Sequence, residues 1–406
     1  MAISLRTLSL ALSGLILLPV VVSAAPDPDP DQAAAVVLLR KNCGDPALEN
    51  CFESMSALTT TGNTGWVWQT RMPTALAPLL IDIGPGEFGP FKCTGTSRGH
   101  VTLRGSGREQ TILKDALNAG VSVTNCKNLS FMDLGAHGVY GVLWTGQSGG
   151  SSSWSNVDLV GLSGGVAAAG WADDGCGDPL VRSVHYFHGS RIRAIGPANF
   201  VTTAFFTRCS ESWIFGGELL VDLTQGSTNL ATVLYINGGF VEAFGTAIRG
   251  RMSGSAATGT AELFGAYMFG NASHSLPATF HSHGVNIGLN TASASTTLDV
   301  VAISASDGVV VHSPGTAYAL TPGLSGSTTR VRVTDGTPMV EAPFHWSAAT
   351  EPPAISSIDG EDLFVETDCT STSCSGGNQP HLMIYAPSAC TSGSPWWDVA
   401  RNACRQ

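Results

Sequence analysis

The stretch "HVTLRGSGREQTIL" (His100–Leu113) decides between two folds, because an apolar strand runs into two closely spaced glycines. A dinucleotide-binding loop requires a third glycine three residues after the second, followed by a helix. Gln110 stands at that third position, and Thr111–Leu113 favour a strand over a helix. We therefore predict that Gly105 and Gly107 shape a turn between two strands.

Short apolar segments separated by glycine-rich and polar turns recur on both sides of this stretch. Their starts lie about 20 residues apart, which is the period of a solenoid coil. The first four are Leu79–Gly84, Val101–Gly105, Val121–Asn125 and Val139–Trp144. Because their apolar residues are consecutive, they fit a parallel stack better than a half-exposed antiparallel sheet. We predict an all-β parallel β-helix, with an antiparallel β-sandwich or barrel as the alternative.

Two segments of the chain look like copies of one another. "TNCKNLSF" (Thr124–Phe131) and "TRCSESWIF" (Thr207–Phe215) each place a cysteine before a polar bend and a new apolar strand. Asparagine suits such a bend, because it tolerates left-handed backbone angles and its amide can hydrogen-bond the neighbouring coil. This self-similarity is typical of a repeat fold.

The N-terminus has the features of a secretory signal peptide. Arg6 precedes an apolar run that ends in small residues, and cleavage after Ala24 fits best. The run is short for a membrane anchor, which is the alternative, and no later stretch of the mature chain is long and apolar enough to span a bilayer. We expect a secreted protein, extracellular or periplasmic, in which disulfides can form.

Four segments are predicted. Residues 1–24 form the signal peptide, and residues 25–45 an acidic, proline-containing linker with the start of an N-terminal cap. Residues 46–345 form the β-helix, which opens with a capping helix over about Pro46–Leu58. Residues 346–406 form a small Cys-rich C-terminal cap, in which Trp396 and Trp397 close the open end of the solenoid.

Composition limits the partners. Only 13% of the residues are charged, and 48 of the 406 are glycine, which is typical of strands and turns. The net charge of −11 argues against nucleic acid or an anionic membrane as partner, because both require a basic surface. The same charge gives no electrostatic steering toward a polyanion.

Ten cysteines fall in three groups. Local spacing predicts a disulfide between Cys43 and Cys51, and pairing within the C-terminal group. Zinc binding by that group is the rival interpretation, but no second close pair or histidine pair completes a ligand set. The connectivity of the middle group stays open. The C-terminal group is Cys369, Cys374, Cys390 and Cys404, and the middle group is Cys93, Cys126, Cys176 and Cys209.

Three segments resemble a known family: "FESMSAL" (Phe52–Leu58), "IDIGPGEF" (Ile81–Phe88) and "VTLRGSGREQTIL" (Val101–Leu113). They are similar to the opening of pectin methylesterases and related pectin-lyase-like proteins, where a capping helix precedes a coil with a Gly-Pro-Gly turn and a coil with a Gly-x-Gly turn. The resemblance implies a right-handed parallel β-helix, a fold used mostly on carbohydrate. The methylesterase catalytic motifs are not matched, since Ser212 stands where that family has its nucleophilic aspartate.

The densest acidic cluster in the predicted stack is "ADDGCGDP". Polygalacturonases, which share the fold, carry an Asp-Asp pair followed by Gly-His-Gly and Arg-Ile-Lys, and a similar order occurs here. The resemblance implies that Asp173, Asp174 and His188 are catalytic. It also implies that Arg191 and Arg193 bind a sugar carboxylate. The alternative is a solvated acidic loop that binds Ca²⁺, and no other cofactor is expected.

A pair of histidines in "FHSHG" has the spacing of metal ligands. No carboxylate lies near His281 and His283 in sequence, so we favour a loop and predict no metal site.

Two functions from different classes remain open. The first is an exported β-helix that binds or degrades a polysaccharide, including a uronate-containing one. The second is a non-catalytic surface or adhesin-like module, for which the β-helix is a rigid rod.

Overall fold

The computed structural model describes most of the chain between residues 35 and 333 and six short strands beyond it. The described residues are 35–44, 51–59, 73–95, 98–146, 150–162, 168–176, 182–198, 202–226, 230–253, 261–291, 298–306, 309–312, 316–322, 326–333, 339–341, 346–348, 363–366, 381–385, 396–398 and 403–404. The predicted signal peptide lies outside them.

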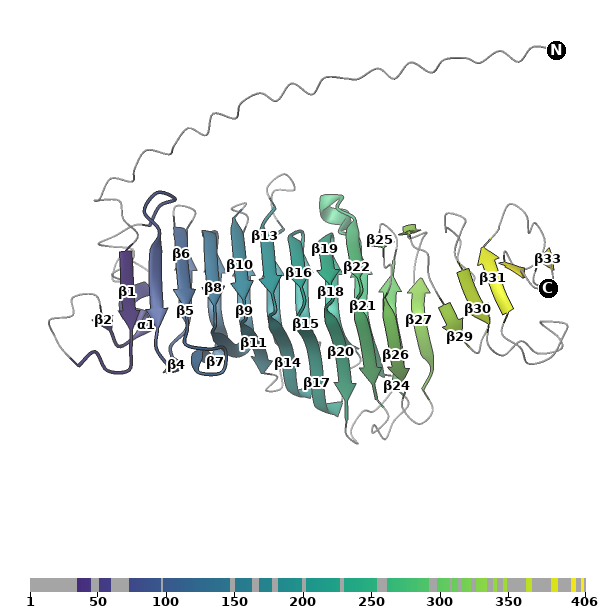
Figure 1. Ribbon diagram of the computed structural model, residues 1–406, viewed down its shortest axis with the longest axis horizontal. Helices are drawn as coiled ribbons and strands as arrows, with labels where there is room; N and C mark the ends of the chain where they lie inside the picture. The colour runs from purple at the N-terminus through teal and green to yellow at the C-terminus, as the bar shows by residue number, and fades with distance from the viewer. Residues whose placement is uncertain are drawn as a thin grey trace, which may run out of the picture.

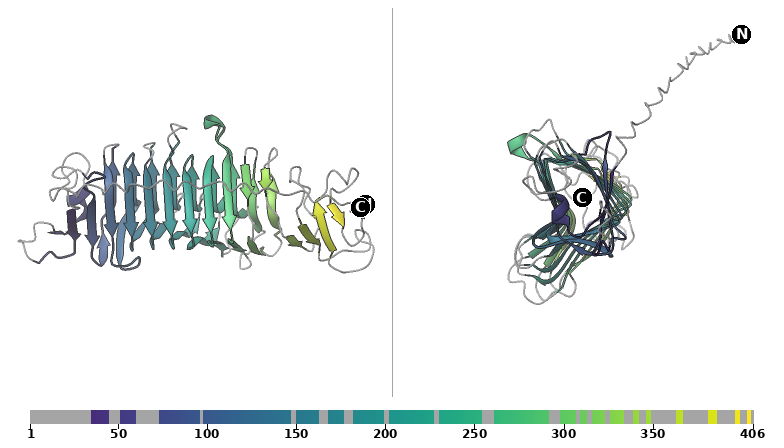
Figure 2. Two further views of the ribbon diagram at one scale, coloured as in Figure 1. Left: turned by 45° about the horizontal axis from the view of Figure 1, so that its top comes forward. Right: turned by 90° about the vertical axis from the view of Figure 1, so that its left-hand side faces the viewer.

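The chain winds into a stack of coils in which equivalent strands pair in parallel (Figure 1). Each full coil contributes strands to three faces, here called A, B1 and B2, which surround the long axis (Figure 2). The predicted parallel β-helix is therefore confirmed, and the sandwich alternative is excluded by the parallel pairing.

Face A is a twelve-stranded sheet. In order along the stack its strands are β2 (Cys51–Phe52), β1 (Ala35–Leu39), β3 (Leu79–Ile83), β6 (Gly99–Arg104), β8 (Lys127–Met132), β10 (Ser151–Ser155), β13 (Val184–His188), β16 (Glu211–Phe215), β19 (Gly239–Phe244), β22 (Ala278–His283), β25 (Val309–His312) and β28 (Met339–Glu341).

Faces B1 and B2 belong to one sheet, because the long strands β7 (Thr111–Thr124) and β9 (Gly135–Thr145) run through both. Face B1 also contains β4 (Gly86–Phe88), β11 (Asp158–Leu162), β14 (Arg191–Ala198), β17 (Glu218–Gly226), β20 (Ala247–Met252), β23 (Asn286–Asn290) and β26 (Ala317–Thr321). Face B2 also contains β5 (Phe91–Thr94), β12 (Ala168–Asp174), β15 (Thr202–Arg208), β18 (Leu230–Asn237), β21 (Ala261–Phe269), β24 (Leu298–Ala305) and β27 (Thr328–Val333).

Coil length varies more than the sequence spacing suggests. On face A, Leu79 pairs with Val101, 22 residues on, whereas Val241 pairs with Phe280, 39 residues on. Part of this 39-residue coil is an excursion between β21 and β22 that contains the short 3₁₀ helix η2 (Ala272–His274). Extra residues are thus accommodated outside the stacked strands.

In six coils the corner between faces A and B1 contains a residue in the left-handed region. These residues have φ between 51° and 66°, a region that favours glycine and asparagine. They are Asp133, Asn156, Gly189, Gly216, Gly245 and Gly284. The Asn156 amide also donates to the Asp133 carboxylate one coil away, at 2.7 Å. At the other corner, Asn125 and Asn128 are left-handed too, as their bend predicts.

Inward side chains form apolar columns, because register partners point to the same side of a sheet. Phe131 and Trp154 stack with ring centroids 3.9 Å apart and planes within 5°, and Phe187 continues the column. All three side chains are fully buried. Met55 and Leu58 of helix α1 (Met55–Thr59) join the same core, so this helix packs against its N-terminal part.

The N-terminal prediction needs two corrections. The helix expected from Pro46 begins only at Met55, since Cys51–Phe52 pairs as strand β2 with β1. The apolar residues in this region have helical spacing, but Cys51 and Phe52 form a strand because they pair with β1. Face A also begins earlier than predicted, because Ala35–Leu39 already pairs with β3.

Disulfides join neighbouring coils. The predicted Cys43–Cys51 bond is present. The middle cysteines, left unassigned by the sequence, pair as Cys93–Cys126 and Cys176–Cys209. Both pairs span 33 residues, about one coil. The side chains of the four C-terminal cysteines lie outside the described residues.

A separate five-stranded sheet follows the last coil at the C-terminal end (Figure 1). Its strands are β29 (Trp346–Ala348), β30 (Leu363–Glu366), β31 (His381–Tyr385), β32 (Trp396–Asp398) and β33 (Ala403–Cys404). Apart from the parallel pair β29 and β30, its strands are antiparallel. Among the described residues, no helix has the length and apolarity needed to cross a membrane.

The corner residue Asn156 provides a test of this geometry. We expect Asn156→Ala to lower stability by about 1–2 kcal/mol, because alanine is strained in the left-handed region and loses the bond to Asp133. Asn156→Gly is the matched control and should stay closer to wild type, because glycine adopts this φ without strain. The midpoint of urea unfolding measures both. Equal losses in the two variants would contradict the argument.

Candidate functional site

The predicted catalytic aspartates lie on opposite sides of strand β12. Asp173 points inward and is fully buried, whereas the side chain of Asp174 points outward and is 52% exposed. The Asp174 carboxylate accepts a hydrogen bond of 3.1 Å from Arg208, its register partner on β15. No turn rotates the two carboxylates to a common side, so they face opposite sides of the sheet.

Asp173 instead belongs to a buried polar chain inside the solenoid. Its Oδ2 lies 3.2 Å from Nε2 of His185, although the two groups are not aligned as a hydrogen bond. The other ring nitrogen, Nδ1, lies 2.7 Å from Oγ of Ser152, which accepts a hydrogen bond from the Trp154 indole. Asp173, His185, Ser152 and Trp154 thus connect faces B2 and A through the core.

The order of carboxylate, imidazole and hydroxyl suggests a nucleophilic triad, but its surroundings exclude that role. The rings of Trp144 and Trp171 each lie 4.8 Å from the His185 ring, roughly edge to face. Both indoles, His185 and Asp173 are fully buried, and Ser152 nearly so. A triad must reach its substrate. This chain of polar groups is therefore structural.

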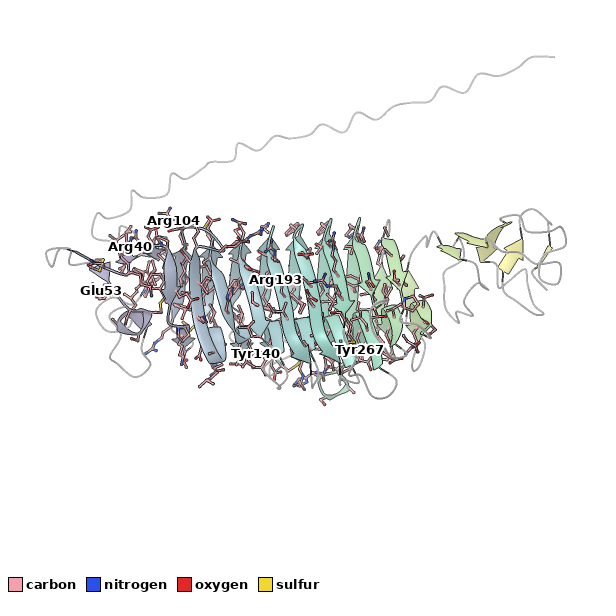
Figure 3. The ribbon with its side chains drawn as sticks, turned by 90° about the horizontal axis from the view of Figure 1, so that it is seen from below. Arg40, Glu53, Arg104, Tyr140, Arg193 and Tyr267 are labelled. Carbon is pink, nitrogen blue, oxygen red and sulfur yellow. A yellow bond between two sulfur atoms is a disulfide. The ribbon has the colours of Figure 1, made fainter. Side chains whose placement is uncertain are left out.

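The other predicted site residues lie on different faces. His188 is exposed on face A, where its ring stacks on Phe215. Arg191 and Arg193 lie on face B1, and Arg193, labelled in Figure 3, sits near the middle of the stack. Nε and Nη2 of Arg193 both donate hydrogen bonds to the carboxylate of Asp158, which is almost fully buried. The five residues are therefore not brought together at one site.

A groove of about 500 Å³ lies on the outer side of face B1, between β17, β20, β23 and β26. Its floor follows from the register, because Arg249, Gly288 and Ala319 share one outward column. Gly288 has no side chain and Ala319 has only a methyl group, so the surface is hollowed next to the long side chain of Arg249. Asn286 and Asn290 stand on the two sides of Gly288, exposed to solvent.

Two arginines form the wall of this groove. Nε and Nη2 of Arg251 both donate hydrogen bonds to the carboxylate of Asp222, and this contact raises the pKa of Arg251. Arg249 is held more loosely, with Nε 3.7 Å from Glu218, and its side chain is 60% exposed. Glu218 also lies 4.0 Å from Arg191, so the predicted ligand Arg191 reaches the edge of the groove through a shared partner. Arg249 is the cation most available to a ligand here.

The outer side of face A carries a ladder of stacked rings. His188, Phe215, Phe244 and His283 stack at centroid distances of 4.7–5.2 Å with planes within 10°. Because the faces of the rings cover one another, mainly their edges meet the solvent. Nε2 of His283, one of the two histidines with ligand spacing, lies 3.0 Å from Glu242. The ladder joins coils more than it offers a stacking platform.

A second aromatic group lies on the outer side of face B2. Phe206, Tyr235 and Tyr267 follow one another in register on three coils, with Phe269 edge-on to Tyr235. Burial raises the pKa of Tyr235 to about 12, and the neighbouring Tyr267 contributes in the same direction. The phenol is therefore neutral at ordinary pH and keeps its proton.

The sequence contained a signal for the groove. Arg249 and Arg251 alternate with buried residues in "AIRGRM", and Asn286, Gly288 and Asn290 alternate in "NIGLN". Such alternation identifies outward residues of a strand. The sequence alone does not show the register that places these two strands side by side.

Comparisons with known proteins give no relative for this chain: no family model, no curated protein and no solved structure matches it.

The two aspartates should respond to substitution in opposite ways. We expect Asp173→Ala to lower stability by about 2 kcal/mol or more, because it leaves His185 buried beside a cavity. Asp174→Ala should cost less than about 1 kcal/mol, because its ion pair is exposed. Chemical unfolding of the two variants measures the difference. A loss at Asp174 as large as that at Asp173 would contradict the assignment of sides.

Proposed function

We propose that this protein is exported and binds polysaccharide through the groove on face B1. The observation that carries the proposal is the donor and acceptor set of that groove: guanidinium groups, amides and a carboxylate around a floor that includes Gly288 and Ala319. Sugar hydroxyls both donate and accept hydrogen bonds, so a mixed set of this kind suits them. A set of donors alone would suit an inorganic anion instead.

Arg249 suggests that the sugar carries a carboxylate. A guanidinium can bind a carboxylate through two parallel hydrogen bonds, and Arg249 has only a loose contact with Glu218. The overall negative charge of the chain provides no long-range attraction for such a ligand. Recognition of a uronate therefore depends on this local contact and on the neighbouring Asn286 and Asn290.

The solenoid form supports a polymeric ligand. Neighbouring strands of a sheet lie about 4.8 Å apart, so the four strands of the groove span roughly 15 Å along the stack. Several sugar units can therefore lie across successive coils. The disulfides between coils and the expected signal peptide agree with an extracytoplasmic protein.

Binding without catalysis is the form of the function that the described residues favour. The groove contains Glu218 but no second carboxylate poised beside it, because Asp222 is engaged by Arg251. Glycoside hydrolysis by the common mechanism needs two carboxyl groups that flank the scissile bond. We therefore propose a polysaccharide-binding protein.

A specific observation also favours the second candidate, a structural or adhesin-like module. The ring ladder on face A and the columns of ion pairs on face B1 both fasten coils to one another. Tyr186 and Phe215 remain exposed on face A, where another protein can contact them. On this alternative, the B1 groove has no ligand.

Binding assays on the mature chain distinguish these candidates. We expect oligogalacturonate or alginate oligomers to bind more tightly than neutral glucan oligomers in calorimetry, and added salt to weaken the acidic ligands. Arg249→Ala should weaken acidic oligomers about tenfold or more, since a hydrogen bond to a charged group contributes about 1.5–3 kcal/mol. Arg104→Ala, which removes an exposed arginine from face A, is the matched control and should bind like wild type.

The same preparation tests for catalysis. No new reducing ends or unsaturated products should appear on pectin, polygalacturonate, alginate or glucan. Release of products that is lost in Asp174→Asn would replace the binding proposal with an enzymatic one. If no oligomer binds, or if Arg249→Ala binds as wild type does, the groove is not the site and the structural alternative takes its place.

A further inference from the structure

The Cys176–Cys209 disulfide lies beside a histidine in a way that its structural role does not require. The ligand atoms of Cys176, Cys209 and His274 all lie within 4.8 Å of one another. Among the described residues, this is the one group of three potential metal ligands gathered so closely. Cys209 is nearly buried, while Cys176 and His274 are half-buried, so the group opens to solvent on one side.

Three coils build this group. Cys176 follows β12, Cys209 follows β15, and His274 comes from η2, two coils further along the stack. Asn271 and Leu276 close the excursion through a β-bridge, and η2 projects at the edge of the solenoid (Figure 1). Gly238 of the intervening coil permits the approach, because a Cβ added there would lie 2.5 Å from Cβ of Asn271.

Asn271 links the sulfurs to the histidine. Its side-chain nitrogen donates to both sulfur atoms at 3.4 Å, and the residue is 5% exposed. Disulfide and thiol sulfur are weak acceptors, whereas a thiolate is the form that a nearby donor stabilises. A buried amide directed at both sulfurs is therefore better suited to the reduced, metal-binding state than to the disulfide.

The same amide sets the tautomer of the histidine. Its Oδ1 lies 3.2 Å from Nδ1 of His274, and an amide oxygen only accepts, so Nδ1 carries the proton. Nε2 then has its lone pair free. A histidine that donates its other ring N–H to a carbonyl oxygen is the usual arrangement for a metal ligand, because the contact fixes both tautomer and orientation.

We propose that Cys176, Cys209 and His274 form a site for a thiophilic divalent cation such as Zn²⁺ when the disulfide is reduced. Tetrahedral zinc with bond lengths of about 2.3 Å to sulfur and 2.0 Å to nitrogen needs ligand atoms roughly 3.3–3.8 Å apart. Opening the disulfide separates the sulfurs toward that spacing. Water completes the fourth position from the open side.

Disulfide and metal exclude one another, and the electrons balance. A thiol or phosphine reductant supplies two electrons, which cleave the S–S bond and give two thiols with two protons. Binding of the cation then releases both thiol protons, because the thiolate is the ligand. A two-electron oxidant, such as a small-molecule disulfide or molecular oxygen, takes up the two electrons of the thiolates, which restores the S–S bond and releases the cation. The occupant of this position therefore reports the redox state of the surroundings.

Cobalt serves as the spectroscopic probe on the full chain, reduced with a phosphine and then freed of reductant under anaerobic conditions. One equivalent of Co²⁺ should give thiolate-to-cobalt charge-transfer absorption and the strong visible bands of tetrahedral cobalt, and Zn²⁺ should displace it. The oxidised protein should give neither signal. Near-ultraviolet circular dichroism of the reduced protein should keep the signature of the buried tryptophans.

Variants separate this site from the other cysteines. The double variant Cys176→Ser/Cys209→Ser retains the other eight cysteines and should lose the signal. His274→Ala, which leaves all the sulfurs in place, should weaken Co²⁺ binding at least tenfold, and Asn271→Ala should weaken it about tenfold through the tautomer. His100→Ala, at a half-buried histidine distant in sequence, is the control.

Three results would overturn the proposal. These are cobalt binding that is unchanged in the double serine variant, binding that is unchanged in His274→Ala, and loss of the folded signature on reduction alone, which would mean that no site is preformed.

Discussion

Parallel, in-register pairing between coils is the constraint on which the rest of this structure depends. Each residue has a partner of the same orientation one coil above and one below, so every position becomes a column. An apolar column is the core, and an outward column is a surface. The surroundings of a residue are therefore set by the other members of its column, as those of Arg249 are set by Gly288 and Ala319.

The buried polar groups inside the solenoid also follow the in-register pairing between coils. On face A one inward column is apolar at both ends but carries Ser152, His185 and Ser212 in the middle. On face B2 the column opposite carries Asp173 and Thr207 over two of the same coils. A slip by one coil would leave Asp173 without His185 beside it. The proximity of these buried polar groups to one another therefore favours a single register.

Much of the fold could be predicted from the sequence because its signals are local. Consecutive apolar residues between turns indicate parallel strands, and Asn125 and Asn128 indicate left-handed bends. The bond Cys43–Cys51 follows from proximity in the chain. The predicted start of the N-terminal helix was wrong for the opposite reason: residues Cys51 and Phe52 pair with β1, and helical periodicity does not reveal that contact.

The candidate site was harder to predict, because it depends on the side of the strand on which each residue lies and on the register between coils. Strand alternation from Trp171 places Asp173 inside and Asp174 outside, so the acidic pair that suggested hydrolysis is divided between core and surface. The groove joins Arg249 to Gly288 across 39 residues, a distance set by the length of one irregular coil. Coil length changes from one turn to the next, so spacing in sequence does not show which residues meet. The local sequence determines on which side of a strand each residue lies. The register with the neighbouring coils determines which other residues it contacts.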